Sequence, residues 1–219
     1  MSDNFEFNIT PPEERDAAGG TELMMKRVME VIPEELQDKF IIVPQRLRDE
    51  HTDSKKKKIL WLHDLAEDPE SAHLKDPKSR ERFAKFVFPS NWAMWEFHQK
   101  LGVPYEDSVV IQNAIEPIEV HEKPKTDKKK IIYFSTPHRG LNLEVDVYSS
   151  FKLYGRDEQD EHPEFQALYG RLQELKSVNY HGTVSNDEIR KALLETHILA
   201  YPSTYRETSC LVAIEAMAA

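Results

Sequence analysis

Short apolar segments alternate with helical patterns along most of the chain, and this alternation constrains the fold more than any other feature. Each apolar segment has the length of a buried strand. Each helical pattern places apolar residues three or four positions apart. Alternation of this kind predicts parallel sheets covered by helices. We therefore expect an α/β protein with two Rossmann-like domains.

The pattern places the elements as follows. Strands are expected at residues 40–43, 59–63, 83–89, 108–112, 131–134, 151–154, 178–181 and 198–201, with residues 5–9 a weaker candidate. Helices are expected after a Thr21 cap, from Ser90 to Leu101 with Gly102 closing it, at 165–175, at 187–196 with Ser185 or Asn186 as cap, and from near Thr208 onward. Trp92 and Trp95 are interpreted as core residues on one face of their helix.

A charged stretch divides the chain. Residues 116–130 contain two prolines and little to bury, so they are interpreted as a linker. The division gives a short N-terminal Rossmann-like domain at residues 1–122 and a C-terminal one at 123–219. The last helix ends among apolar residues, with no closing glycine and no following strand. We therefore expect the second domain to be truncated and incomplete.

Composition excludes several classes of protein. The net charge of −10 argues against a nucleic-acid-binding surface. The lysine runs at 55–58 and 128–130 each precede an apolar strand and are interpreted as solvated loops. Attraction of a phosphorylated or membrane-bound substrate is the alternative. The N-terminus is acidic and lacks the apolar core of a signal peptide, and the single cysteine excludes an internal disulfide. We expect a cytoplasmic protein with at most peripheral membrane contact.

The segment YPSTYRETSCLVAIEAMAA at residues 201–219 carries the clearest chemical signal. A buried strand ends in a polar loop, and the loop leads into a helix. Ligands of open α/β sheets bind at this position, where free backbone N–H groups favour an anion. Glu207 precedes the expected helix and Glu215 lies two turns inside it, so both can serve one cleft. The alternative is a pair of ordinary exposed charges.

This segment resembles the E-x7-E motif of the retaining GT-B glycosyltransferases, in particular glycosyltransferase family 4. Four further stretches are similar to that family's motifs in the same order. They are Gly19-Gly20-Thr21-Glu22, Asn113-Ala114-Ile115 with alanine in place of the usual glycine, Ser135 to Leu141, and Tyr180 to Ser185 followed by Glu188-Ile189.

The resemblance implies a role for each matching residue. Glu215 would bind the ribose hydroxyls of the nucleotide, and Glu207 would contact the transferred sugar. Arg139 would neutralise the diphosphate, and His63 would face the sugar across the cleft. The amides of Thr208, Ser209 and Cys210 would hold sugar or phosphate oxygens, and Gly19 and Gly20 would allow close approach of the donor. Lys152 and Arg156 are weak candidates for a second basic residue.

Simpler interpretations stay open for these residues. Arg139 could be an exposed loop cation, His63 a core histidine at a strand end, and the glycine pair a turn before a helix. Cys210 is interpreted as a small residue packed at a helix start, not as a nucleophile. The histidines and the cysteine show no metal-ligand spacing, so no bound metal is expected.

The function implied by the resemblance is hexosyl transfer from a nucleoside diphosphate sugar to a carbohydrate, lipid or protein acceptor. Retention of configuration and independence of metal or other cofactors are likewise implied by the family. The alternatives are a non-catalytic nucleotide-sugar-binding fragment and a GT-B nucleotide-sugar epimerase. A nucleic-acid-binding role ranks behind both.

Overall fold

The computed structural model describes residues 19–47, 51, 54–119, 122, 123, 125, 130–134, 146–149, 163–175 and 178–219. The chain forms two compact units, each with one parallel four-stranded sheet. The first unit contains Thr21–Ala114 together with Arg206–Ser209. The second contains the described parts of Ile115–Tyr205, Cys210–Ala219 and residues 19 and 20. None of the described helices is both long and apolar enough to cross a lipid bilayer.

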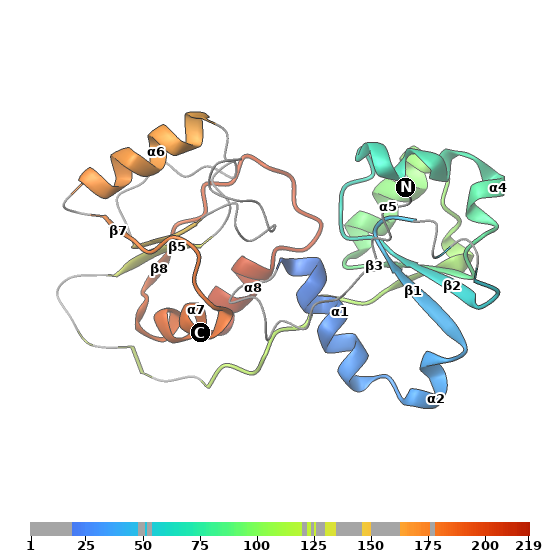
Figure 1. Cartoon of the computed structure of the whole chain (residues 1–219), viewed down its shortest axis with the longest axis horizontal. Coiled ribbons are helices and arrows are strands. Elements are labelled where there is room, and N and C mark those ends of the chain that lie inside the picture. Colours follow the sequence, from blue (N-terminus) through green and yellow to red (C-terminus); the bar gives the residue numbers. More distant parts are fainter. Residues whose placement is uncertain are drawn as a thin grey trace, which may run out of the picture. The chain divides into compact units, whose positions relative to one another are not determined.

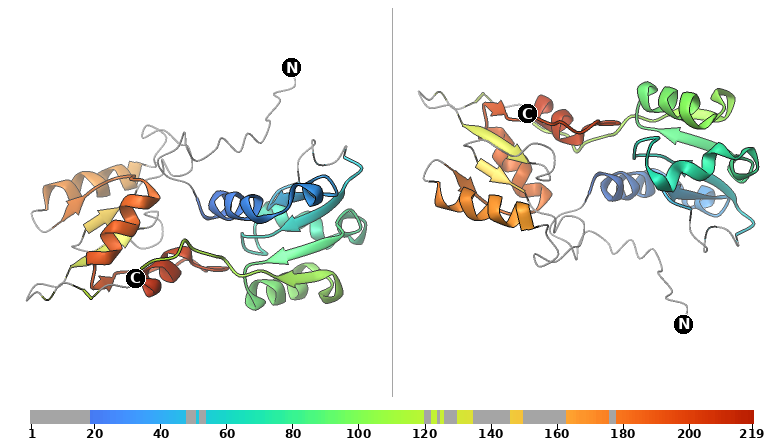
Figure 2. Two further views of the ribbon diagram at one scale, coloured as in Figure 1. Left: turned by 90° about the horizontal axis from the view of Figure 1, so that it is seen from below. Right: turned by 90° about the horizontal axis from the view of Figure 1, so that it is seen from above.

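The first sheet follows the order of the chain, β1-β2-β3-β4, and all its strands are parallel (Figure 1). Its strands are β1 (Phe40–Pro44), β2 (Lys57–Trp61), β3 (Lys85–Phe88) and β4 (Ser108–Val110). The helical elements of this unit are α1 (Gly20–Val31), α2 (Glu34–Gln37), η2 (Pro69–Lys75), α4 (Pro77–Arg80), α5 (Asn91–Leu101) and η3 (Tyr105–Asp107). Figure 2 shows α1 and α5 on opposite faces of this sheet. The arrangement is the covered parallel sheet that strand–helix alternation predicts.

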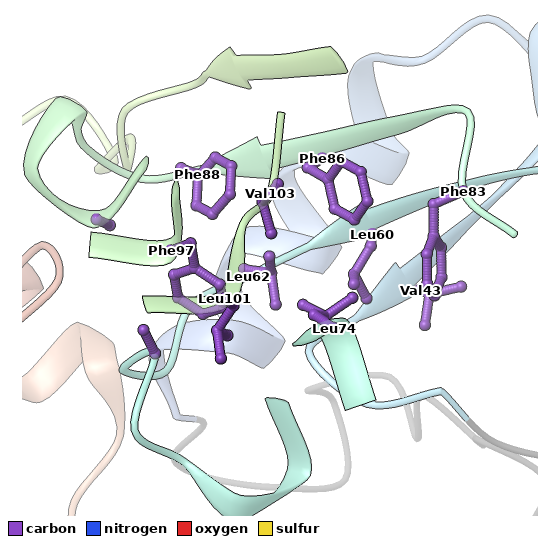
Figure 3. Packing of buried hydrophobic residues seen from close by; sticks show 12 residues of the cluster. Val43, Leu60, Leu62, Leu74, Phe83, Phe86, Phe88, Phe97, Leu101 and Val103 are labelled. Atoms are coloured by element: carbon purple, nitrogen blue, oxygen red, sulfur yellow. The ribbon is translucent and has the colours of Figure 1, made fainter. Parts of the chain in front are cut away.

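One face of the first sheet forms a large aromatic and aliphatic core. Phe86 and Phe88 of β3 project to the same side because successive strand residues alternate between faces. They pack with Leu60 of β2, with Leu62 just after this strand and with Phe97 of α5 (Figure 3). The Phe88 and Phe97 rings lie 5.3 Å apart and are tilted by 54°. This core fixes the positions of the strand ends and therefore also the positions of the loops that follow them.

Local signals at both ends of α5 agree with the sequence. Ser90 caps the helix, and its hydroxyl accepts the Ala93 backbone N–H at 3.1 Å. Gly102 ends the helix with φ of 70°, a left-handed conformation that glycine adopts without steric cost. The helix therefore begins and ends where the sequence predicts.

The second sheet has the order β7-β6-β5-β8, again parallel. Its elements are β5 (Ile131–Phe134), β6 (Asp146–Tyr148), α6 (Pro163–Glu174), β7 (Asn179–Tyr180), α7 (Asn186–Glu195), β8 (Ile198–Leu199) and α8 (Leu211–Ala218). Tyr133 and Val147 pack against α6 on one face. Ile132 and Phe134 pack against α7 and α8 on the other. Each unit is thus an α/β sandwich, which confirms the predicted fold class.

The structure corrects several predicted details. Thr21 does not cap the first helix, because α1 already begins at Gly20. The last helix begins at Leu211 with Cys210 as its cap, three residues later than predicted. Trp92 and Trp95 are not core residues, since 37% and 48% of their surfaces are exposed. The strand β6 was not predicted, and the strands predicted at 151–154 and 5–9 lie outside the described residues.

Candidate functional site

The carboxyl ends of β1 to β4 meet at one edge of the first sheet, because the strands are parallel. A polar residue follows each of them closely. Gln45 comes after β1, His63 after β2, Ser90 after β3 and Asn113 after β4. This is the edge at which open α/β sheets bind their ligands.

Residues 206–209 lie along this edge. Three hydrogen bonds hold them there, from Thr208 Oγ1 to the His63 carbonyl (2.5 Å), from Ser90 Oγ to the Thr208 carbonyl (2.7 Å) and from Asn113 Nδ2 to the Ser209 carbonyl (3.1 Å). The strand ends of β2, β3 and β4 each contribute one partner. Glu207 therefore belongs to a segment that is bonded directly to the backbone of His63. These are the two residues predicted to be catalytic.

Arg206 fixes the beginning of the same segment. Its guanidinium donates to Glu67 Oε1 at 2.6 Å and to Glu96 Oε2 at 2.7 Å, and it lies 5.0 Å from the centre of the Trp92 ring. Lys100 also donates to both carboxylates. Hydrogen bonds from Lys100, and after them those from Arg206, lower the pKa of both carboxyl groups. The network keeps these charges paired, which makes the geometry of the segment specific.

Nothing in the sequence pointed to Arg206. Its two carboxylate partners lie 139 and 110 residues earlier in the chain, and neither belongs to a recognised motif. The position of Arg206 also explains the surface location of Trp92, because the guanidinium covers part of the Trp92 ring.

His63 has an unusual environment. Burial lowers the pKa of its imidazole from 6.5 to about 4, so the ring is neutral near pH 7. The ring centre lies 4.9 Å from that of Trp61, with the two planes tilted by 42°. Its Nε2 is buried and has no hydrogen-bond partner. A neutral imidazole can use this nitrogen either to donate or to accept one hydrogen bond.

Unpartnered polar atoms gather at the same edge. Among the described residues, four buried side-chain nitrogen or oxygen atoms lack a partner. They are Trp61 Nε1, His63 Nε2, Asn113 Oδ1 and Thr183 Oγ1. The first three belong to the ends of β2 and β4, and only the last lies in the second unit. Buried polar atoms are nearly always hydrogen-bonded, so such a group marks a place where a polar ligand or water is accommodated.

Glu215 lies in the second unit, within α8. Val212 and Ala216 of this helix pack against the core formed by Ile132 and Phe134, and the Glu215 side chain is half-buried. Cys210 caps the helix, with its Sγ accepting the Ala213 backbone N–H at 3.4 Å. Because α8 starts only at Leu211, a shared helical face cannot relate Glu207 to Glu215.

The later start of α8 places residues 208 and 209 before the helix. The amides of Thr208 and Ser209 do not belong to the first turn of the helix. Only Cys210 stands at the helix start, as its cap. The Thr208 hydroxyl and the carbonyl groups of Thr208 and Ser209 form hydrogen bonds with residues at the edge of the first sheet.

The structure describes some of the remaining predicted site residues and not others. Gly19 is buried, and Gly20 begins α1. A Cβ atom at Gly20 would lie 3.1 Å from Leu211 Cδ1, so any other residue there would require that side chain to move by a few tenths of an ångström. Arg139, Lys152 and Arg156 lie outside the described residues. The functional roles of all these residues remain predictions.

Comparison with solved structures identifies the architecture. HepE of Anabaena in complex with UDP-glucose is 16% identical and has a TM-score of 0.60, over 90% of this chain and 61% of its own. A glycosyltransferase from Rickettsia africae is 13% identical with a TM-score of 0.56, over 100% of this chain and 62% of its own. The fold is that of the GT-B glycosyltransferases.

Further comparisons show how much of the known structures this chain covers. The lipopolysaccharide outer core galactosyltransferase WaaB is 13% identical with a TM-score of 0.51, over 91% of this chain and 58% of its own. This chain thus spans 58% to 62% of the length of the three structures. No family model matches the sequence. No curated protein matches it either.

Proposed function

We propose that this chain is a glycosyltransferase that moves a sugar from a nucleoside diphosphate sugar to an acceptor, with retention of the anomeric configuration. One observation carries the proposal. The segment containing Glu207 is hydrogen-bonded across three strand ends of a GT-B-type sheet, directly beside the half-buried, neutral His63.

In this proposal His63 binds the sugar and does not transfer protons. A pKa of about 4 leaves no imidazolium to act as an acid near pH 7. The unpartnered Nε2 of His63 and Nε1 of Trp61 instead offer hydrogen-bonding groups to sugar hydroxyls. Trp61 Nε1 can only donate, whereas the neutral imidazole can also accept. The pair therefore matches hydroxyl groups, which both donate and accept.

In the proposal, Glu207 and Glu215 bind different parts of the donor. The Glu207 carboxylate accepts hydrogen bonds from hydroxyls of the transferred sugar, and the Glu215 carboxylate accepts them from the ribose. Arg139 stabilises the diphosphate as the bond from the anomeric carbon to its oxygen breaks, because negative charge develops there. The acceptor hydroxyl then bonds to the anomeric carbon, and its proton passes to the departing phosphate oxygen. No metal ion is needed for these steps.

Donor binding is the first test. The purified chain is titrated calorimetrically with UDP-, GDP- and ADP-sugars, alongside Glu215→Gln, Glu207→Gln and, as a control, Glu174→Gln. Glu174 is an exposed glutamate at the end of α6. Hydrogen bonds to a charged group contribute about 1.5–3 kcal/mol, so Glu215→Gln is expected to weaken binding about 10- to 100-fold. The control should bind as the wild type does.

The outcome separates the rival functions. Saturable binding of one donor, followed by transfer with the anomeric configuration retained, supports the proposal. Binding without any turnover would indicate a non-catalytic binding protein, and a new sugar formed without an acceptor would indicate an epimerase. If a folded sample bound no donor, the proposal would be wrong.

A further inference from the structure

Gln45 has a backbone conformation that sequence alone does not explain. It follows β1 directly and has φ of 60°, the only positive value among the described non-glycine residues. Its residue surface is 5% exposed. A non-glycine residue in this region is strained, and such strain persists only where surrounding contacts enforce it. The contacts of Gln45 are therefore informative.

The Gln45 side chain links three parts of the first unit. Its Oε1 accepts the backbone N–H of His63 at 2.7 Å and that of Asp64 at 2.8 Å. Its Nε2 donates to Ser71 Oγ at 3.2 Å, and its own backbone N–H donates to the Trp61 carbonyl at 2.8 Å. Only the oxygen of the Gln45 amide can accept hydrogen bonds from two N–H groups. These partners therefore determine which end of the amide is the oxygen.

These bonds coincide with the point at which the chain leaves the sheet. The Leu62 N–H still donates to the Val87 carbonyl of β3 at 2.9 Å. The next two amides, of His63 and Asp64, have no strand as partner and donate to Gln45 instead. Gln45 thus holds the backbone of His63 at the point from which the imidazole with its unpartnered Nε2 extends.

We propose that Gln45 is the positioning residue that holds His63 in the orientation needed to bind the sugar. This inference rests on the proposed function, since it concerns the same site. The positive φ lies in a tight turn, where the Arg46 N–H donates to the Pro44 carbonyl at 2.6 Å, and from this turn the Gln45 amide oxygen accepts both N–H groups. A residue that only filled space would require neither the strained backbone nor the bifurcated acceptor.

Two substitutions separate positioning from packing. Gln45→Leu keeps the approximate volume and removes the acceptor. Gln45→Glu keeps the shape and the acceptor, and the Ser71 hydroxyl can then donate to the carboxylate. Small displacements of a substrate-binding group cost up to about 100-fold in rate. We expect Gln45→Leu to lower kcat/KM about 10- to 100-fold, because a displaced His63 binds the sugar less well, and Gln45→Glu to restore most of it.

The mode of action is tested by combination with His63→Ala. If Gln45 acts through His63, Gln45→Leu causes no further loss of rate in the His63→Ala background. The same loss in both backgrounds would overturn the proposal. Gln99→Leu, the same change of residue type on the exposed face of α5, is the matched control and should behave as the wild type.

A measurement without turnover distinguishes this inference from the proposed function. Nuclear magnetic resonance of ¹⁵N-labelled protein reports the His63 ring and the amides of residues 63 and 64. Gln45→Leu should shift or broaden all three signals, and Gln45→Glu should return the ring signal to its wild-type position. If wild type shows no transfer, the function fails, and these spectra still decide the inference.

An unchanged His63 ring signal in folded Gln45→Leu would refute the inference. If Gln45→Leu does not fold, Gln45→Gly replaces it, because glycine relieves the positive φ while still removing the acceptor. The same spectral shift is then expected, and its absence has the same meaning.

Discussion

His63→Gln should remove a pH-dependent contribution to the stability of the first unit. In the folded chain, burial lowers the pKa of His63 from 6.5 to about 4. Between these values the unfolded chain binds a proton that the folded chain does not. Stability from this group is therefore complete above about pH 6.5 and is lost as the pH falls toward 4.

The size of the effect follows from the same pKa values. A lowering from 6.5 to about 4, at about 1.4 kcal/mol for each pKa unit, corresponds to about 3 kcal/mol of unfolding free energy. Burial also lowers the pKa of His73, so this group changes stability with pH in the same direction. The informative quantity is thus the difference between wild type and His63→Gln at each pH.

Tryptophan fluorescence provides the assay. All three tryptophans, Trp61, Trp92 and Trp95, lie in the first unit, so urea unfolding followed by fluorescence reports this unit alone. The advantage of wild type over His63→Gln should shrink by about 3 kcal/mol between pH 7 and pH 4. A difference that stays constant over this range would refute the reasoning. So would an imidazole titration of His63 near pH 6.5.

Four further changes test the packing and the helices by chemical or thermal unfolding. Ser185→Ala removes the capping box with Glu188 and should destabilise α7 by about 1 kcal/mol; an unchanged midpoint would contradict the cap. Phe97→Ala should cost about 3–5 kcal/mol, because the ring is fully buried in the core of the first unit. Gly102→Ala should destabilise by about 1 kcal/mol owing to its φ of 70°. Gly170→Ala, inside α6 with open space around the new Cβ, should instead stabilise by about 1 kcal/mol, and equal signs for the two glycines would refute the argument.

The elements that sequence predicted well are those determined locally. Ser90 and Gly102 mark the ends of α5 because a cap needs only the residues beside it. Ser185 and Glu188 likewise form their capping box within four residues. Runs such as Ile131–Phe134 are apolar enough to be recognised as buried strands without knowledge of their neighbours.

The elements that sequence missed depend on distant partners. The strand β6 has three residues and begins with Asp146, so its register is set by pairing with β5 and β7 and not by its own pattern. Trp92 and Trp95 were assigned to the core from their helical spacing. The buried stripe of α5 instead follows Ala93, Phe97 and Leu101, which recur every four residues.

The same distinction between local signals and distant partners applies to the candidate site. Glu207 and His63 were predicted from motif resemblance, and the structure joins their segments through the Thr208 hydroxyl. Gln45 and Arg206 were not predicted, because their importance lies entirely in partners that fold toward them from elsewhere in the chain. Polar contacts of this kind leave no periodic trace in a single sequence.

The order of strands also determines when each part of the protein can form during synthesis. In the first sheet each new strand pairs with the one made just before it, so that sheet can assemble as the chain leaves the ribosome. In the second sheet the last strand, β8, returns to pair with the first, β5, since Ile131 pairs with Ile198. The hydrogen bonds between residues 206–209 and the first sheet form later still. The carboxyl edge of the first sheet is therefore completed only after the strands of both sheets have been made.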